Sequence, residues 1–400
     1  MNKAIYRLGM GLAVLSVCSL PISATIRYSL EDMEKASSRG GFGVVQSNGL
    51  TFLKGSIGKD FPMGPLSVGA DLNLYYATAG DGTYPSDLQL ITLRSIEYNH
   101  NNTAGIKYGR LSDVTYGYGL LMDSYDSGMG GDTTEFTLKK GGFKGYATLM
   151  GARADALGTF GSLYAGRLSG DLLDINLGGT PLKWGVTAVS DRDGVNETVN
   201  GSQITREEST GYSADLALPF AGDFLTYYVE YAHLNNHGNG LSTGFKGDFF
   251  DIVKYRMEYQ TLESGFVPGY FNTAYEASSF DFATNAPTTA INGFIGNISL
   301  ALPSTPFKGG IQIESYSDRS LLSAAVGWSN VGNTTGVINY IQPFQSASTP
   351  ILDSTVLYQT GDMFDYIVNI KRVYYTSNMF TESYSVGFRF NPNKILPGIF

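Results

Sequence analysis

The chain has 400 residues, of which 50 are glycine, 27 tyrosine and 23 phenylalanine, and only 16% are charged. Its formal net charge of −9 argues against a nucleic-acid partner, and its single cysteine excludes an internal disulfide. A chain of this length can form two or three ordinary domains or one large β architecture, and its glycines and aromatic residues favour strands over helices.

The first 24 residues have the layout of a secretory signal peptide. Lys3 and Arg7 precede an apolar run at 8–20, and small residues lead up to Ala24. The run is shorter than the ~20 residues that a spanning helix needs, so a membrane anchor is the weaker interpretation. We expect cleavage after Ala24. The mature chain would then carry a net charge of −11 instead of −9, because Lys3 and Arg7 are removed, and it would contain no cysteine.

Alternation of apolar and polar residues begins after residues 25–40, which we expect to form a periplasmic N-terminal segment. A period of two places the two sets on opposite faces of a β-strand. In the stretch 253–260 every second residue is apolar, beginning with Val253, and the residues between them carry three formal charges. The clearest further segments are 66–75, 212–218, 225–231, 321–329, 364–370 and 383–390.

The connections between these segments predict the number of strands. The alternation changes phase near Arg94, as a β-bulge would require. The strands that follow residue 50 come to an odd number, whereas a barrel whose two ends leave on one side needs an even number. Either the segment around Phe42 is one more strand, or one predicted strand is false. We expect about 18 strands, with a range of 16 to 20. Short connections are predicted at 101–103, 141–142, 221–223 and 250–251, and longer ones at 78–87, 112–132, 191–209 and 262–289.

Two kinds of surroundings fit the alternation. A soluble β-sandwich buries its apolar face, whereas a membrane barrel turns that face to lipid. Aromatic residues near strand ends, and runs that approach the ~9–11 residues of a bilayer-crossing strand, favour the barrel. Unpaired backbone groups are costly in hydrocarbon, so the sheet must close. The sequence therefore predicts an all-β fold, a transmembrane antiparallel β-barrel whose polar face lines a water-filled interior.

The signal peptide, the alternating strands, the short and long connections in turn, and the closing segment YSVGFRF at 384–390 together resemble outer-membrane β-barrels of diderm bacteria, porins in particular. The resemblance is to the architecture and assigns no specific family. It implies one transmembrane domain over residues 25–400, integral to the bacterial outer membrane. It also implies outer-membrane lipids and the barrel-assembly machinery as partners, and homotrimers are common in this class. In such barrels the final strand usually ends the chain at an aromatic residue, whereas here a C-terminal tail at 391–400 follows Phe390.

The polar faces of the strands supply the residues that would line the interior. At about 16–18 strands a barrel is too wide for side chains to fill, so these residues would contact water. Their charges would set selectivity, and the acidic excess predicts a mild preference for cations. The lumen-facing candidates are Asp71, Asn73, Asp215, Glu230, Lys254, Arg256, Glu258, Asp365 and Arg389.

One long segment, 262–289, is rich in aromatic residues, which argues against disorder. It could fold inward and narrow the pore, or it could pack on the rim or between subunits. In the first case its acidic residues would face Lys254 and Arg256. The constriction candidates are Glu263, Phe266, Tyr270, Phe271, Tyr275, Glu276 and Asp281.

No residue pattern predicts catalysis, a cofactor or a metal centre. His233 and His237 are spaced as a zinc pair on a helix would be, but they end a strand and enter a turn rich in Asn and Gly. Neither they nor His100 lies in the local signature of an outer-membrane hydrolase. The segment from Asp191 resembles part of a calcium loop, but Gly194 is at the fourth position instead of the sixth and no glutamate is at the twelfth. We therefore expect that the chain is not an enzyme.

The function predicted from the sequence is a porin-like channel for passive diffusion of small hydrophilic solutes or ions. One alternative is a dedicated outer-membrane transporter of a less polar substrate. Another is a structural or surface-interaction β protein that conducts nothing, either as a barrel without an open pore or as an exported soluble sandwich.

Overall fold

The computed structural model places most of the chain between residues 38 and 390. The residues described are 38–47, 50–77, 91–101, 103–109, 111, 113–127, 142–149, 151–159, 163–173, 181–192, 196–199, 202–205, 208–221, 224–272, 275, 286–303, 305–343, 350–360, 364–376 and 379–390. Residues 1–37 and 391–400, which include the predicted signal peptide and C-terminal tail, lie outside this set. No helix among the described residues is both long and apolar enough to cross a bilayer.

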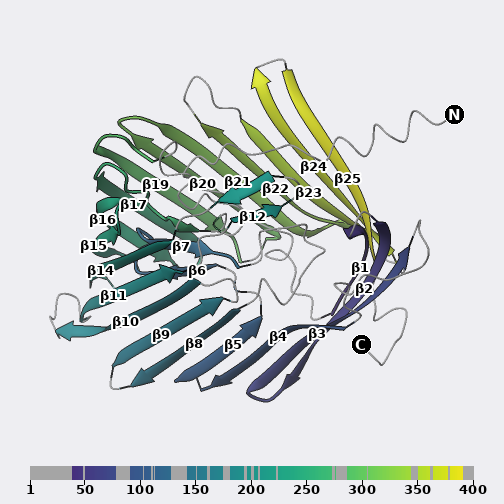
Figure 1. Cartoon of the computed structure of the whole chain (residues 1–400), viewed down its shortest axis with the longest axis horizontal. Helices are drawn as coiled ribbons and strands as arrows, with labels where there is room; N and C mark the ends of the chain where they lie inside the picture. Colours follow the sequence, from purple (N-terminus) through teal and green to yellow (C-terminus); the bar gives the residue numbers. More distant parts are fainter. Residues whose placement is uncertain are drawn as a thin grey trace.

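One antiparallel sheet contains 20 of the strands in the described part of the chain (Figure 1). Neighbours along the chain are neighbours in the sheet, because short turns join antiparallel strands. Its strands are β1 (Ser38–Ser47), β2 (Leu50–Met63), β3 (Leu66–Ala77), β4 (Ile91–His100), β5 (Ala104–Gly109), β8 (Gly142–Leu149), β9 (Ala152–Thr159), β10 (Leu163–Leu173), β11 (Leu182–Asp191), β14 (Ser209–Pro219), β15 (Thr226–Leu234), β16 (Gly238–Phe249), β17 (Val253–Leu262), β19 (Ile291–Ala301), β20 (Phe307–Tyr316), β21 (Ser320–Val331), β22 (Thr334–Pro343), β23 (Ile351–Gln359), β24 (Phe364–Thr376) and β25 (Met379–Phe390).

The first and last strands of the sheet also pair with each other. Phe42 of β1 and Phe388 of β25 are antiparallel partners, which joins the two ends of the sheet and makes the fold a barrel. The predicted all-β antiparallel barrel is confirmed. Counted over the described residues, the sheet has 20 strands, two more than the central expectation and at the top of the expected range. The segment around Phe42 is the additional strand that an even number requires.

Because neighbouring strands are antiparallel, successive connections lie alternately at the two ends of the barrel. The longer connections after β3, β5, β11 and β17 all leave strands that point the same way. The short connections between β4 and β5, between β14 and β15 and between β16 and β17 lie at the other end. The prediction for 141–142 is wrong, because Gly142 opens β8 and pairs with Gly109 rather than turning the chain. The bulge is confirmed at Arg94: Gly69 pairs with Ser95 and the next residue of β3 pairs with Leu93.

Smaller sheets are formed by parts of the longer connections. β6 (Val114–Tyr116), β7 (Met122–Tyr125) and β18 (Phe271–Asn272) form a three-stranded sheet, in which β18 runs parallel to β7. β12 (Asn196–Val199) and β13 (Ser202–Thr205) form a hairpin. In Figure 1, β6 and β7 lie within the ring of the large sheet. Connections that leave one end of the barrel therefore return to its interior.

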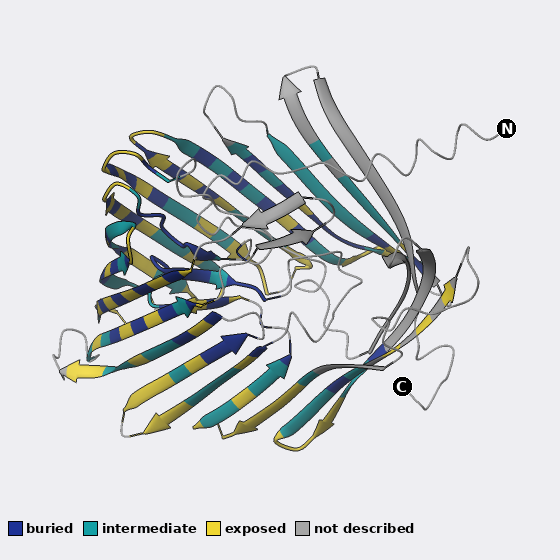
Figure 2. Ribbon diagram, viewed as in Figure 1, coloured by how far each residue is buried: buried dark blue, intermediate teal, exposed yellow. Residues whose placement is uncertain are grey.

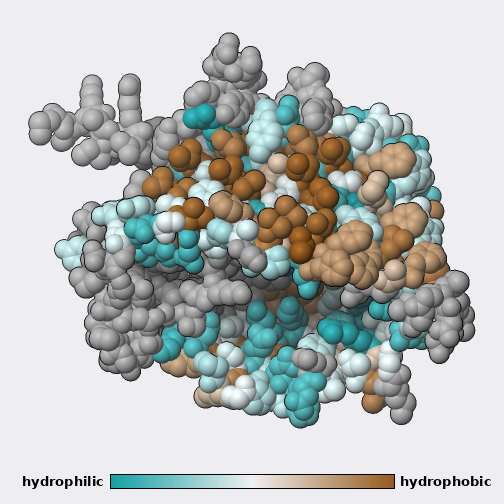
Figure 3. Space-filling view, turned by 180° about the vertical axis from the view of Figure 1, so that it is seen from behind, coloured by the Kyte–Doolittle hydropathy of each residue, from teal (hydrophilic) through white to brown (hydrophobic). Residues whose placement is uncertain are grey.

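The two faces of the strands meet different surroundings. On β17, Met257 is 65% exposed and the adjacent Glu258 is 3% exposed, and Figure 2 shows the same alternation as stripes along β14 to β21. Seen from behind, hydrophobic side chains gather in a broad band over the strands in the upper part of the molecule (Figure 3). The exposed apolar set includes Leu72, Leu74, Ile106, Tyr164, Leu168, Val186, Tyr212, Leu216, Leu241, Phe245, Phe294, Ile298, Ile311, Ile313, Val326 and Ile338. A soluble sandwich would bury this set, so the sandwich alternative is wrong.

Candidate functional site

Two connections fold back into the barrel and pair with each other. We call the described residues between 111 and 127 inner segment A, and those between 263 and 275 inner segment B. The Gly269 N–H of segment B donates to the Leu120 carbonyl at 2.8 Å, and the Phe271 N–H donates to the Leu121 carbonyl at 3.2 Å. These bonds continue the parallel pairing of β18 with β7. The two segments therefore form one packed unit.

An apolar core holds this unit against part of the barrel wall. Segment A contributes Leu111, Val114, Tyr116, Leu120, Leu121, Met122 and Tyr125, and segment B contributes Phe266, Val267, Tyr270, Phe271 and Tyr275. The wall contributes Leu157, Leu163, Ala165, Val189, Ala232, Leu234, Leu262, Ile291, Ile295 and Tyr316. We call the inner face of β10, β11, β14 to β17, β19 and β20 the covered wall. Burial of apolar side chains on both partners fixes the inner segments to it.

Glycines on the inner face make room for the inner segments. A Cβ at Gly240 of β16 would lie 2.5 Å from Phe266, and a Cβ at Gly211 of β14 would lie 2.8 Å from Leu121. Real Cβ atoms do not approach other atoms so closely, so only glycine permits these contacts. The sequence thus leaves side chains out of the wall where the inner segments lie on it.

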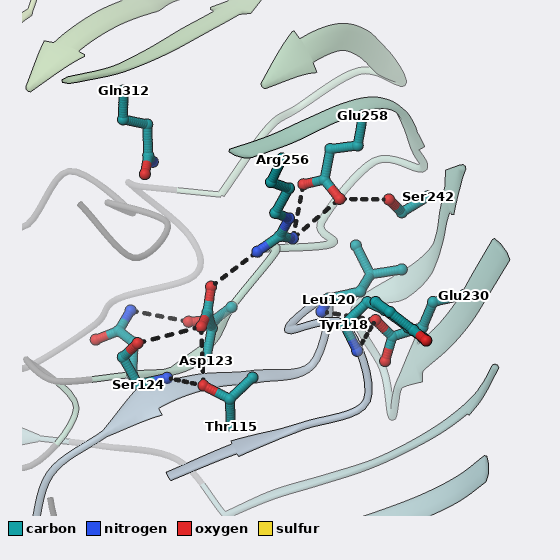
Figure 4. A network of polar contacts seen from close by, with 12 residues as sticks. Thr115, Tyr118, Leu120, Asp123, Ser124, Glu230, Ser242, Arg256, Glu258 and Gln312 are labelled. Carbon is teal, nitrogen blue, oxygen red and sulfur yellow. Dashed lines mark hydrogen bonds and ion pairs between the residues drawn. The ribbon is translucent and has the colours of Figure 1, made fainter. Parts of the chain in front are cut away.

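Arg256 and Glu258 of β17 are the centre of a first polar network (Figure 4). Arg256 Nη2 donates to both carboxylate oxygens of Glu258, at 2.8 and 2.9 Å. Glu258 also accepts hydrogen bonds from Tyr228 Oη at 2.6 Å and Ser242 Oγ at 2.9 Å. Arg256 Nη1 lies 3.5 Å from Asp123 Oδ2 of inner segment A. A buried charge is tolerated when it is paired and hydrogen-bonded, and here the pairing also ties the segment to the wall.

Asp123 is the residue through which inner segment A meets this network. Thr115 Oγ1 and Ser124 Oγ donate to its Oδ1 at 3.1 and 3.2 Å. Burial raises the pKa of the Asp123 carboxyl, and the Arg256 guanidinium and the Thr115 hydroxyl oppose that rise. The charged form of Asp123 therefore depends on its contact with the wall.

A second network begins at Arg167 of β10, which reaches across β11 to Asp215 of β14. Its Nη1 and Nη2 donate to Asp215 Oδ2 and Oδ1 at 2.6 and 2.9 Å, and Nη1 also donates to Thr187 Oγ1 at 3.0 Å. The path is open because Gly185 has no side chain, and a Cβ there would collide with the guanidinium. Two parallel N–H···O bonds to a carboxylate make this a strong, directional pair.

Glu230 lies opposite Asp215 in the register of β14 and β15 and is fully buried. Its Oε2 accepts hydrogen bonds from the backbone N–H groups of Tyr118 and Leu120, each at 3.0 Å. Its Oε1 has no hydrogen-bond partner among the described residues. Gly117, with a φ of +68°, lies directly over it, so that a Cβ would collide with Oε1 and lie 3.2 Å from Asp215 Oδ2. The backbone of inner segment A thus rests on a wall carboxylate.

Tyr118 completes the contact between segment A and the covered wall. Its ring stacks on that of Tyr228 with centroids 4.0 Å apart, and Lys246 Nζ lies 4.3 Å from the centroid of its ring. Burial raises the pKa of the Tyr118 hydroxyl, and Asp215 adds to the rise, so this residue stays neutral at physiological pH. The stack and the cation above it add to the backbone bonds at Glu230.

The inner face of β4, β5, β8 and the first half of β9 is more accessible, and we call it the open wall. The side chains of Glu97 and Lys107 are 51% and 31% exposed, and their charged groups are 4.0 Å apart. Arg153 pairs with Asp155 at 2.8 Å and lies over the Tyr146 ring at 4.3 Å. Charged groups on this side of the interior are therefore reachable from solvent.

Four of the predicted lumen-facing residues, Asp215, Glu230, Arg256 and Glu258, come together on the covered wall, and Asp365 is buried on β24. The expectation of water along the whole interior is wrong for the covered wall, because the inner segments bury it. Lys254 lies near the start of β17, where its Nζ is 3.3 Å from Asp248 Oδ2. The remaining candidates are Asp71 and Asn73 on β3 and Arg389 on β25, whose side chains lie outside the described residues.

The aromatic constriction candidates Phe266, Tyr270, Phe271 and Tyr275 are all buried in the core of the inner unit. Tyr275 Oη donates to Asp191 Oδ2 of β11 at 2.6 Å, and Ser209 Oγ of β14 donates to Tyr270 Oη at 3.2 Å. Segment B therefore packs on the inside of the barrel. Glu276 and Asp281 lie outside the described residues.

The expected contact of Glu263 with Lys254 and Arg256 is wrong. Glu263 Oε2 accepts hydrogen bonds from the backbone and side-chain nitrogens of Asn239, at 3.1 and 2.7 Å. Glu263 follows the end of β17, and at the rise of a strand it lies roughly 20 Å along the chain from Arg256. Among the described residues, the carboxylate that crosses the interior to Arg256 is Asp123.

Sequence reasoning missed inner segment A and the role of Arg167. The connection at 112–132 was predicted only as a long polar loop, yet it contains the apolar run Leu120–Leu121–Met122. Such a run has to be buried somewhere, and in a barrel with an apolar exterior the interior is one place for it. Arg167 had no comparable signal, because its partner Asp215 is two strands away.

No group of three His, Cys, Asp or Glu side chains suited to a metal ion occurs within the described ranges. His233 Nδ1 lies 2.6 Å from Asn239 Oδ1, and its ring packs against that of Tyr212 at 4.8 Å. This histidine is thus held by its strand neighbours.

No protein-family model matches the sequence, and no curated protein matches it. Among solved structures, the outer-membrane protein Wzi of Escherichia coli, described as a carbohydrate-binding β-barrel, is 10% identical, covers 92% of this chain and 89% of its own, and has a TM-score of 0.39. The outer-membrane protein opdK of Pseudomonas aeruginosa is 11% identical, with 88% and 96% coverage and a TM-score of 0.34. A mutant porin of Rh. blastica is 10% identical, with the same coverage and a TM-score of 0.29. At these scores the likenesses carry no argument, and the barrel assignment rests on the strand pairing.

The strand pairing and the surface together define the architecture. An even number of antiparallel strands joined end to end, with an apolar band outside and charged side chains inside, is the architecture of an outer-membrane β-barrel.

Proposed function

We propose that this chain is an integral outer-membrane channel through which small hydrophilic solutes and ions diffuse passively. The observation that supports it best is the contrast between the two faces of the same strands, apolar and exposed outside, polar and charged inside. An apolar exterior on a sheet whose first and last strands pair with each other suits a lipid bilayer, and a charged inner face suits hydrated solutes.

The passage would run along the open wall, because inner segments A and B occupy the covered wall. Glu97, Lys107 and Arg153 would line it, and their exposure supports contact with solutes. The inner unit would act as the constriction. The aromatic residues of segment B would narrow the passage through the volume of the packed unit. Their rings would not contact solutes, because they face the core of the unit.

Selectivity and partners belong to the same proposal. The acidic balance of the chain supports a mild preference for cations. Outer-membrane lipids would contact the apolar band, and the barrel-assembly machinery would insert the chain, with β25 as its last strand. A homotrimer would be tested by the mass of the complex extracted in mild detergent.

Reconstitution of the purified chain into planar bilayers tests the function. We expect discrete current steps, a reversal potential of the sign for cations across a salt gradient, and larger steps from a variant that lacks residues 266–282. Heat-modifiable gel migration of both proteins serves as the control for folding. Unchanged conductance in the deletion variant contradicts the constriction. A folded barrel without current steps contradicts the channel, and saturable uptake of one compound class with little ion current would favour a dedicated transporter.

A further inference from the structure

We propose that Glu230 is a proton-controlled anchor for inner segment A. Its ionised carboxylate holds the segment on the covered wall, and its protonation releases the segment into the interior. The proposal goes beyond passive conduction and rests on the proposed function only for its electrical readout.

The anchor is built from backbone groups of one element and a side chain of another. Oε2 of Glu230 accepts both N–H groups, those of Tyr118 and Leu120, at 3.0 Å. Tyr118 and Leu120 are 112 and 110 positions from Glu230 in the sequence, so the contact depends on the tertiary fold. Gly117 places the turn against the carboxylate, since any side chain there would collide with Oε1.

The charges around Glu230 are balanced between opposing effects. Asp215 faces it from β14 and disfavours a second negative charge, although Arg167 of β10 holds Asp215 in a bidentate pair. Arg256 of β17 acts on it from beyond Tyr228, and Lys246 of β16 lies above the Tyr118 ring. Full burial disfavours the charged form, and the two N–H donors and the Ser213 hydroxyl of β14 favour it. The protonation state of Glu230 therefore depends on opposing effects of its surroundings.

Protonation changes what Glu230 offers to the segment. Hydrogen bonds from N–H groups to an ionised carboxylate are roughly twice as strong as those to a neutral acceptor, so both bonds weaken together. The proton would sit on Oε1, the oxygen that has no partner among the described residues. The nearest carboxylate, Asp215, already uses both oxygens to bind Arg167, so the new O–H competes with an existing pair. Acidification thus weakens both of the hydrogen bonds by which Glu230 holds the segment.

Asp123 is the alternative anchor and must be separated from Glu230. It holds the same segment through Arg256 Nη1 at 3.5 Å, and its carboxyl also titrates. That contact is a side-chain ion pair made by a residue of β7, whereas Glu230 binds the backbone of the turn between β6 and β7. Asp123→Asn removes the ion pair and leaves the Glu230 carboxylate in place. The two anchors therefore give different variants with different predicted pH profiles.

Amide hydrogen exchange of the full-length barrel in detergent, corrected for the intrinsic exchange rate at each pH, tests the proposal. In the wild type we expect exchange in a peptide spanning 116–121 to become at least tenfold faster as the pH falls through roughly pH 8 to 4, the range in which perturbed carboxyl groups titrate. Glu230→Gln should exchange fast at every pH, because it mimics the protonated state. Asp123→Asn should keep the pH step, and Glu97→Gln, on the open wall, should match the wild type.

Gly117→Ala provides a second route, because it pushes the turn off Glu230 and leaves every wall residue unchanged. It too should remove the pH step. The proposal is overturned if the wild type shows no step, if Glu230→Gln or Gly117→Ala retains it, or if Asp123→Asn abolishes it. In planar bilayers the step should coincide with a change in conductance, because the released segment moves within the interior. If the barrel conducts nothing, the exchange data still decide the anchor, so failure of the channel and failure of the anchor are distinguishable.

Discussion

The covered wall and the open wall are two parts of one inner surface, built from the same kind of alternating strand, yet their charged residues behave differently. On the covered wall, Arg167 and Asp215 are 14% and 3% exposed at the side chain and share two short hydrogen bonds. On the open wall, Arg153 is 49% exposed although its pair with Asp155 is also short, at 2.8 Å. The difference comes from the inner segments, which cover one wall only. Alternation therefore tells which face points inward, and the connections decide whether that face is wet.

Breaking one ion pair on each wall should give the largest contrast. Arg167→Met leaves the buried Asp215 carboxylate without its partner, which costs about 3–5 kcal/mol of unfolding free energy in comparable buried pairs. Arg153→Met removes an exposed pair, worth about 0–1 kcal/mol. The urea midpoint of heat-modifiable gel migration reports both. Equal losses of stability would contradict the distinction between the walls.

A glycine substitution sharpens the comparison at the contact between wall and inner unit. Gly240→Ala should displace Phe266 from the covered wall, and overpacking of this kind costs about 1–3 kcal/mol. Gly296→Ala is the control on β19, two strands away in the sheet, because a Cβ there meets no atom within 4 Å. Both variants are compared by the same urea midpoint. If Gly240→Ala is as stable as Gly296→Ala, Phe266 does not pack on the wall as described.

The smallest expected effect concerns ion selectivity. Glu97→Lys reverses a charge on the open wall, so the reversal potential across a salt gradient should shift toward anions by a few millivolts without loss of stability. Asp318→Lys makes the same change in net charge at the turn between β20 and β21 and should shift it less. A larger shift in reversal potential from Asp318→Lys than from Glu97→Lys would contradict the proposal that the open wall lines the passage.

The barrel could be predicted from the sequence because its signal is local. In β17, the alternation of Met257 and Glu258 alone separates the two faces, and the phase change at Arg94 alone locates a bulge. The strand around Phe42 was the uncertain element, because its glycines weaken the alternation. An even number of strands required β1 as an additional strand. In the structure β1 pairs with β25 and so joins the two ends of the sheet.

The interior could be predicted only in part because its contacts are not local. The aromatic residues of segment B indicated an inward fold, but nothing near Glu263 showed that Arg256 would instead meet Asp123, more than a hundred residues earlier. Likewise, Glu230 reads as one acidic residue on a polar face, and its bonds to Tyr118 and Leu120 depend on a loop folding across the barrel. Sequence patterns predict the strands and the face on which each residue lies. Contacts between residues on opposite sides of the barrel can be identified only from the folded structure.

The central claim is that the apolar face meets lipid and the polar face of the open wall meets water. Thiol labelling tests it directly, because Cys18 is the only native cysteine and is easily replaced. In lipid vesicles, Glu97→Cys should react rapidly with a water-soluble maleimide, whereas Met257→Cys should react slowly and be quenched by a lipid-phase probe. Rapid aqueous labelling of Met257→Cys, with no quenching by the lipid probe, would contradict the account.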